Sequence, residues 1–323
     1  CSSDLLYIEG LETVDISEKT LSEQLVTCIH QSKRAGYALE KWEFLKDYKY
    51  SVIFTCNDFS STLKKAKEII PLENTYENDY LYTSFVKPVA YSMDGYYFLK
   101  FNLAYAAIHP LTQEEFLTKY PFLVVFHEKG ELIEFRFDVL KRVFLSDKKE
   151  PTIYSNLIAE MSDYFKEHFE CDLIPLNLDF MVNVCKRDEN VKLIAQSMKL
   201  PNGGNAQLDV GNNQEYILPF IGELRSLLND NQAELEKVPD FREALEQFMF
   251  EMEEMSDYPW IELLWENEIK TRSNRVKFVF NYMNKSYCLI QYYYSNVLIG
   301  MERMNYVIEY IVNHRNDDTT QNE

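Results

Sequence analysis

The clearest alternation of apolar and polar positions in this chain lies between Tyr120 and Phe144. Residues 122–126 form an unbroken apolar run, which is typical of a strand buried on both faces. Residues 128–130 follow as a turn in which Gly130 can take a positive φ. After the turn, apolar and charged residues alternate, which predicts a return strand nearer the sheet edge with one charged face. Its apolar residues are Ile133, Phe135, Phe137 and Val139, and its charged residues are Glu134, Arg136 and Asp138.

The rest of the first half predicts an antiparallel sheet with helices beside it. Residues 50–56 are apolar and β-branched and lead through a polar turn into a helix over 61–70. Asp94-Gly95 is a strong hairpin signal between 89–91 and 96–103. Residues 114–119 are predicted as a helical turn or two, and 153–169 as an amphipathic helix that covers the sheet.

The second half reads mainly as helices. Apolar spacing predicts one helix near residues 220–228, a second that Asp240 caps, and a third that opens at Pro259 and runs to Ile269. Residues 276–280 and 287–293 predict a hairpin. A last helix is predicted after Ser295, with Val297, Met301, Met304, Ile308 and Ile311 on its apolar side.

These elements predict the α+β class, with a mixed, mostly antiparallel sheet and flanking helices, followed by a mainly helical region with one β-hairpin. A chain of 323 residues favours two domains. We expect a sheet domain over residues 1–200, with a sub-boundary near 146–151, and a helical domain over 214–323. Residues 201–213, which are rich in Gly and Asn, are the expected linker.

Charge and composition limit the classes of molecule that this protein is expected to bind. The net charge of −19 disfavours a dominant nucleic-acid-binding face but leaves a local basic patch open. It favours other proteins as partners, a basic one in particular, and leaves a homo-oligomer open. No apolar run reaches the ~18 residues of a membrane span. Six scattered cysteines without a CxxC pair are typical of reduced thiols in a cytoplasmic protein.

Catalytic motifs give no assignment. Asp240, together with Glu268 and Lys270, matches the carboxylate–carboxylate–lysine pattern of many metal-dependent nucleases. Both acids, however, fall on predicted helices rather than on neighbouring strand ends. The five histidines lie too far apart for a local zinc motif, and no cofactor motif is present. We therefore name no catalytic residue and no cofactor, and any metal ligands stay unknown.

One anion- or ligand-binding site is predicted where the strand over 50–56 meets its helix. Strand ends in α/β sheets bind ligands, and a helix N-terminus attracts anions. An ordinary helix cap with a solvated basic face is the simpler interpretation of the same residues. The candidate residues are Asn57, Asp58, Ser60, Ser61, Thr62 and Lys64.

Two stretches are candidates for partner binding. Residues 287–294 are dense in aromatic side chains, some of which must face outward in a strand. Residues 234–268 are strongly acidic, which suits a basic partner, although a solvated helical face explains such acids more simply. The candidate residues are Tyr292, Tyr293, Tyr294, Glu251, Glu253 and Glu254.

The sequence therefore predicts a non-enzymatic, cytoplasmic binding or scaffold subunit of a multi-protein assembly that uses aromatic and acidic surfaces. One alternative is a metal-dependent nuclease or hydrolase that uses carboxylates of the C-terminal half. A second alternative is a bacterial lipoprotein anchored through Cys1. The apolar residues 5–8 argue against this alternative, because they leave no polar tether after the cysteine.

Overall fold

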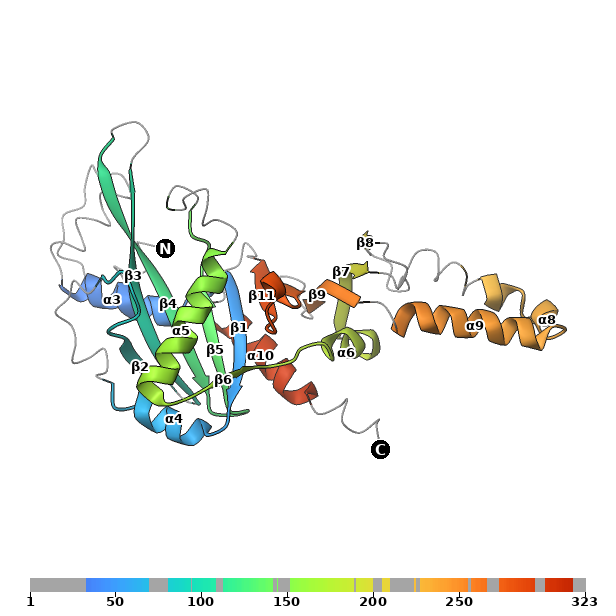
Figure 1. Cartoon of the computed structure of the whole chain (residues 1–323), viewed down its shortest axis with the longest axis horizontal. Coiled ribbons are helices and arrows are strands. Elements are labelled where there is room, and N and C mark those ends of the chain that lie inside the picture. Colours follow the sequence, from blue (N-terminus) through green and yellow to red (C-terminus); the bar gives the residue numbers. More distant parts are fainter. Residues whose placement is uncertain are drawn as a thin grey trace. The chain divides into compact units, whose positions relative to one another are not determined.

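The computed structural model describes most of the chain between residues 33 and 315 (Figure 1). The described residues form two compact units. The first comprises residues up to Tyr48, 53–174 and 300–302, and the second comprises 49–52, 175–293 and 303–315. The described ranges are 33–69, 81–93, 95–108, 113–141, 144, 152–188, 190–199, 205–209, 224, 227–254, 257–265, 273–293 and 300–315.

The first unit is an antiparallel sheet with helices. Its strands follow the order β2-β3-β4-β5, and β1 lies next to β5. Long pairing joins β3 to β4, from Tyr96 opposite His127 to Ile108 opposite Glu115. The elements are α3 (Lys33–Leu45), β1 (Tyr50–Cys56), α4 (Phe59–Ala66), β2 (Val89–Met93), β3 (Tyr96–Ile108), β4 (Glu115–His127), β5 (Leu132–Phe137), α5 (Ile153–Phe169) and β6 (Leu173–Pro175).

One face of this sheet is aromatic and lies under α5. Phe165 of α5 packs with its ring centroid 6.0 Å from Phe126 and 5.8 Å from Phe135. Tyr164 meets Phe101 edge-on at 5.0 Å. Residues 122–127 of β4 are all buried, so the predicted double-sided strand and its covering helix are confirmed.

The opposite face carries charge, and it is buried too. Glu134 and Arg136 of β5 are fully buried, with Arg136 Nη2 at 2.6 Å from Glu134 Oε2. His127 Nε2 lies 2.8 Å from the same oxygen. The prediction that this strand lies nearer the sheet edge is therefore wrong, because β5 lies between β4 and β1 and its charged face is buried. The alternation of apolar and charged residues correctly assigned the two faces of β5. The charged face can be buried because its charged side chains form ion pairs.

The second unit is also built on an antiparallel sheet. Tyr50 and Ser51 of β1 pair with β11, and the order continues β11-β10-β9-β7-β8. Its remaining elements are α6 (Met181–Arg187), β7 (Val191–Lys199), β8 (Asn205–Asp209), α8 (Gln232–Leu235), α9 (Pro239–Glu254), β9 (Asp257–Trp265), β10 (Asn274–Val279), η3 (Tyr282–Asn284), β11 (Leu289–Tyr293) and α10 (Glu302–His314).

The mixed α+β character and the mostly antiparallel sheet are as predicted, but several details are not. Residues 257–265 form β9 between β7 and β10 rather than a helix that opens at Pro259. Residues 115–119 likewise begin β4 rather than a helical turn. In both places a partner strand provides backbone hydrogen bonds that local spacing does not reveal.

The unit boundary also differs from the expected one. The chain passes to the second unit at Pro175, and residues 205–209 of the predicted linker form β8 against β7. The expected sub-boundary at 146–151 and the cap at Ser295 lie outside the described residues. In the described part of residues 214–323, strand β9 joins the predicted hairpin of β10 and β11, beside helices α8, α9 and α10.

In the part of the chain that the structure describes, no helix is both long enough and apolar enough to cross a membrane.

Candidate functional site

The surface that stands out in the second unit is the helical hairpin of residues 227–254, which includes α8 and α9. The α9 segment begins at Pro239, whose fixed φ suits a first helical turn. Phe241, Leu245 and Phe248 follow at helical spacing and form one stripe. The hairpin places this stripe in solvent rather than in a core. Leu227, Val238, Phe241, Phe248 and Phe250 are each 48–58% exposed.

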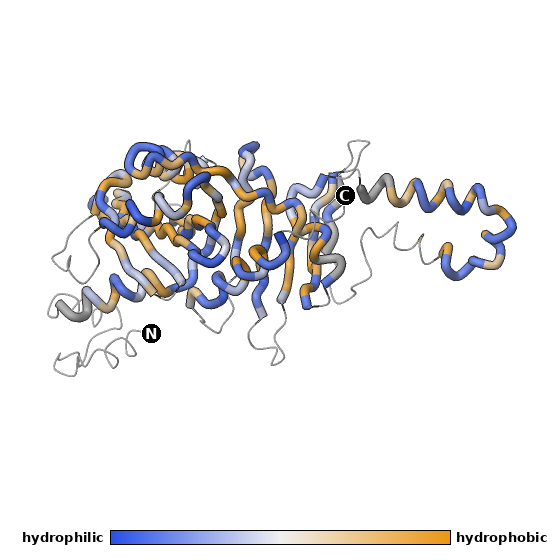
Figure 2. Tube along the Cα trace, turned by 90° about the horizontal axis from the view of Figure 1, so that it is seen from below, coloured by the Kyte–Doolittle hydropathy of each residue, from blue (hydrophilic) through white to orange (hydrophobic). Residues whose placement is uncertain are grey.

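Phe241 and Phe248 are two turns apart on one face of α9 and are both exposed, whereas Phe250 is exposed on the opposite face. Single exposed apolar residues are normal on any protein, but contiguous ones are costly unless a partner covers them. Figure 2 shows the same pattern as orange apolar positions that recur among blue hydrophilic ones along α9. The hairpin therefore has the character of an interaction surface.

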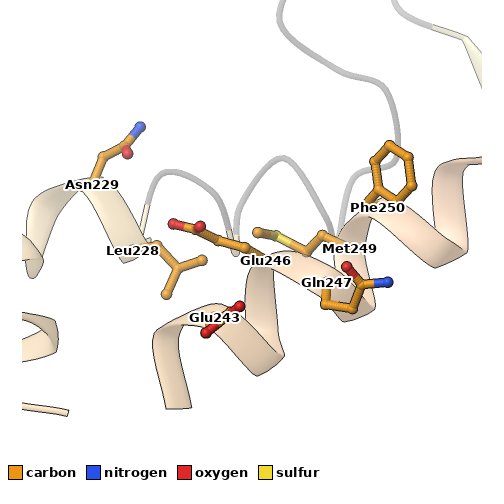
Figure 3. A pocket seen from close by; sticks show the side chains of 7 residues that line it. All are labelled: Leu228, Asn229, Glu243, Glu246, Gln247, Met249 and Phe250. Carbon is orange, nitrogen blue, oxygen red and sulfur yellow. The ribbon is translucent and has the colours of Figure 1, made fainter. Parts of the chain in front are cut away.

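A hollow lies on the other side of α9 from the stripe, next to Leu228 and Asn229. It has a volume of about 540 Å³, and Figure 3 shows Leu228, Glu246 and Met249 gathered at its centre. Met249, one of the residues that line the hollow, is buried at 4% exposure. The lining residues are Leu228, Asn229, Glu243, Glu246, Gln247, Met249 and Phe250.

The charge of this hairpin is strongly negative. The α9 sequence has six acidic residues and a single base, Arg242. That base is already paired, since Arg242 Nε donates to Glu246 Oε1 at 2.7 Å, and the pair raises the pKa of Arg242. Lys237 pairs in the same way with Glu234 at 2.7 Å. The surface that remains offers carboxylates beside aromatic rings.

The predicted partner-binding residues divide between this hairpin and the sheet. Glu251, Glu253 and Glu254 lie in the last turn of α9. Tyr292 is fully buried in β11, where its hydroxyl lies 3.5 Å from Ser51 Oγ, so it cannot contact a partner. Tyr293 is half-buried against Lys49 and Arg275, and Tyr294 lies outside the described residues.

The predicted anion-binding residues sit around the start of α4. Asp58 Oδ1 accepts the backbone N–H of Ser61 at 2.8 Å, and the Thr62 hydroxyl donates to the Asp58 carbonyl. The carboxylate thus caps the helix and takes an N–H that an anion would need. Asn57, Ser60, Ser61 and Lys64 are exposed, whereas Thr62 is buried. The geometry therefore fits the simpler interpretation of an ordinary capped helix.

The structure adds two residues to this region that the sequence did not connect. Cys56, at the end of β1, is hydrogen-bonded to Cys171, which follows α5. The cysteines are far apart in sequence and form no CxxC motif. Only the folding of α5 back along the sheet brings them together.

Among the described residues, no group of three or more His, Cys, Asp or Glu side chains could hold a metal ion. Asp240 lies in the first turn of α9, and Glu268 lies outside the described residues. Comparison with known protein families finds no match, and comparison with curated proteins finds none either.

Proposed function

We propose that this protein is a binding subunit of a protein assembly that docks a cationic, amphipathic helix of another protein on its α8–α9 hairpin. The observation that carries this proposal is the apolar stripe of Phe241, Leu245 and Phe248 on a helix whose charged residues are almost all acidic. A helix that lies against such a stripe would bury its own apolar face there and place basic residues over the carboxylates.

Charge argues against two other occupants. A second copy of this chain would bring a net charge of −19 against the same acidic surface. Nucleic acid needs cations for its phosphates, and α9 has only the paired Arg242. A basic protein segment is the occupant that the charge favours.

The proposal is tested with a synthetic helical peptide of Leu, Lys and Arg in amphipathic order and with a scrambled isomer of the same composition. Fluorescence anisotropy measures the binding of each to the full chain. We expect the amphipathic peptide to bind at least tenfold more tightly than its isomer, because only the ordered peptide presents an apolar face. Equal binding of the two would overturn the proposal, since it would reflect charge alone.

Variants locate the contact. Phe241→Ser combined with Phe248→Ser should weaken peptide binding by roughly 10- to 100-fold, the usual loss of two interface anchors. Tyr306→Ser is the matched control, because Tyr306 is 47% exposed on α10 and outside the hairpin. An effect of Tyr306→Ser equal to that of the double variant contradicts the proposal. So does a wild-type dimer that Phe248→Ser dissociates, or binding to zwitterionic vesicles that the double variant abolishes.

A further inference from the structure

Cys56 and Cys171 lie where two segments of the first unit are held together. The Thr55 hydroxyl donates to the carbonyl of Ile174 at 3.3 Å, and β6 pairs with β1 at this point. The backbone N–H of Cys171 donates to the carbonyl of Phe165 at 3.3 Å. The backbone on either side of the two cysteines is therefore fixed by hydrogen bonds.

The two thiols meet at the start of α4. The side chains of Cys56 and Cys171 are hydrogen-bonded to each other, and Cys56 Sγ lies 3.9 Å from Thr62 Oγ1. Cys56 is half-buried, whereas Cys171 is buried at 6% exposure. One thiol of the pair is open to a small reagent and the other is shielded behind it.

The surroundings of the two thiols shift the pKa values of Cys56 and Cys171 in opposite directions. The hydrogen bond from Cys171 is the main reason that the pKa of Cys56 is lowered to about 7, against the effect of burial. The same hydrogen bond, together with burial, raises the pKa of Cys171. At neutral pH about half of Cys56 is thus thiolate, and Cys171 is its protonated neighbour.

We propose that Cys56 and Cys171 are a reversible dithiol–disulfide site that reacts with low-molecular-weight disulfides such as glutathione disulfide. The Cys56 thiolate attacks one sulfur of that disulfide, and the other half leaves as a thiolate. Cys171 then loses its proton and attacks the Cys56 sulfur of the mixed disulfide, which releases the second thiolate. The protein thiols give up two electrons, and the external disulfide is reduced to two thiols.

Cys288 provides a comparison within the same chain. It is buried, and burial raises its pKa well above the ordinary value of 9.0. A thiol in that state is a poor nucleophile. We therefore expect a disulfide reagent to react with Cys56 and not with Cys288.

The experiment uses the reduced full chain in buffers of defined glutathione-to-glutathione-disulfide ratio. Free thiols are blocked with N-ethylmaleimide, and peptide mass mapping then identifies each cysteine. We expect a Cys56–Cys171 linkage as the main product in the wild type, with Cys288 still blocked as a free thiol. Stable glutathione on Cys56 with Cys171 free would overturn the proposal, because the second thiol would then not resolve the first.

Substitutions separate the two roles. Cys171→Ser should accumulate the Cys56–glutathione mixed disulfide, and Cys56→Ser should leave Cys171 unmodified because it is shielded. Cys288→Ser should behave as the wild type. Modification of Cys171 in Cys56→Ser at the wild-type rate contradicts the assigned order. The wild-type mapping needs no substitution, so the proposal stays falsifiable even if a variant fails to fold.

Kinetics give an independent readout. At pH 7 a thiol of pKa about 7 is about half ionised, against about 1% for one of pKa 9.0. The lower basicity costs about eightfold in nucleophilicity, which leaves about a sixfold faster reaction with iodoacetamide than an ordinary exposed thiol. The rate should rise with a midpoint near pH 7. A midpoint near 9 would overturn the assignment of Cys56 as the attacking thiolate.

Discussion

Lys100 Nζ lies 2.6 Å from Glu43 Oε2 in the first unit, and the lysine side chain is fully buried. Lys119 Nζ approaches the same glutamate at 2.7 Å, and both lysines also pair with Glu40. Two ammonium groups and two carboxylates thus neutralise each other between α3 and strands β3 and β4. A helix that places acids over buried lysines makes the charged face of this sheet tolerable.

Removal of one partner from this cluster should be costly. Glu43→Gln is expected to lower the free energy of unfolding by ~3 kcal/mol or more, because it leaves a buried lysine less compensated. Lys100→Met with Glu43→Leu should lose less than the sum of the two single variants, since Lys119 and Glu40 stay balanced. Urea unfolding measures Glu43→Gln, the single variants Lys100→Met and Glu43→Leu, and the double variant. Lys67→Met, which breaks the exposed pair with Glu128, is the control and should change stability by less than ~1 kcal/mol. Strict additivity would contradict the coupling.

Stability should depend on pH through Glu134. Burial alone would raise its pKa, but the charge of Arg136 and the hydrogen bond to His127 lower it below the ordinary 4.5. The unfolded chain therefore binds a proton between the two pKa values that the folded chain does not bind. The contribution of Glu134 is complete above pH 4.5 and is lost as the pH falls through the folded value.

Glu134→Gln tests this dependence. The variant should lose stability at pH 7, where Arg136 loses its partner charge, and its stability should fall less than that of the wild type as the pH drops from 5 to 3. Urea unfolding at several pH values gives both slopes. Identical slopes would show that Glu134 does not titrate differently on folding.

Met249 and Phe248 are neighbours on α9 with opposite environments. Met249 is 4% exposed and Phe248 is 48% exposed. Met249→Ala should speed amide hydrogen exchange within residues 227–250, because it removes buried packing from the hairpin. Phe248→Ala should leave exchange nearly unchanged. An equal effect of the two would mean that the apolar stripe is already packed, which would also remove the basis for a docking surface.

Gly300 and Gly95 form a matched pair of glycines in the first unit. Both have positive φ, at 67° and 77°. A Cβ on Gly300 would lie 2.8 Å from the Leu45 carbonyl oxygen, whereas one on Gly95 meets nothing within 4 Å. Gly95→Ala should cost ~1–2 kcal/mol from the backbone conformation alone. Gly300→Ala should cost clearly more by thermal unfolding, since backbone must also move. Equal losses would mean that the backbone near Leu45 yields freely.

Periodicity predicted the elements that carry their own pattern. The β4–β5 hairpin, helix α5 and the β10–β11 hairpin all appear where spacing and turn residues indicated. The stripe on α9 was equally visible in the sequence. What the sequence did not show is that this stripe stays exposed, because exposure depends on whether another segment covers it.

Ambiguous patterns failed in an instructive way. Ile261, Leu264 and Trp265 fit a helix face, but Ile261 and Trp265 also fit a strand, together with Leu263. The pairing of β9 with β7 and β10 decided between them. A period of two and a period of 3.6 share positions over short apolar runs, so only long-range hydrogen bonding resolves such a segment.

By itself, the sequence determined the α+β class, the aromatic core strands and the acidic composition of the chain, since these follow from local spacing and residue content. The tertiary structure alone decided which charged residues are buried, that Phe241 and Phe248 are exposed, and that Cys56 meets Cys171. Each of these depends on contacts between segments distant in the chain. No local pattern records such contacts, because the energy of a buried charge, an exposed ring or a thiol pair is set by the neighbour that folding brings to it.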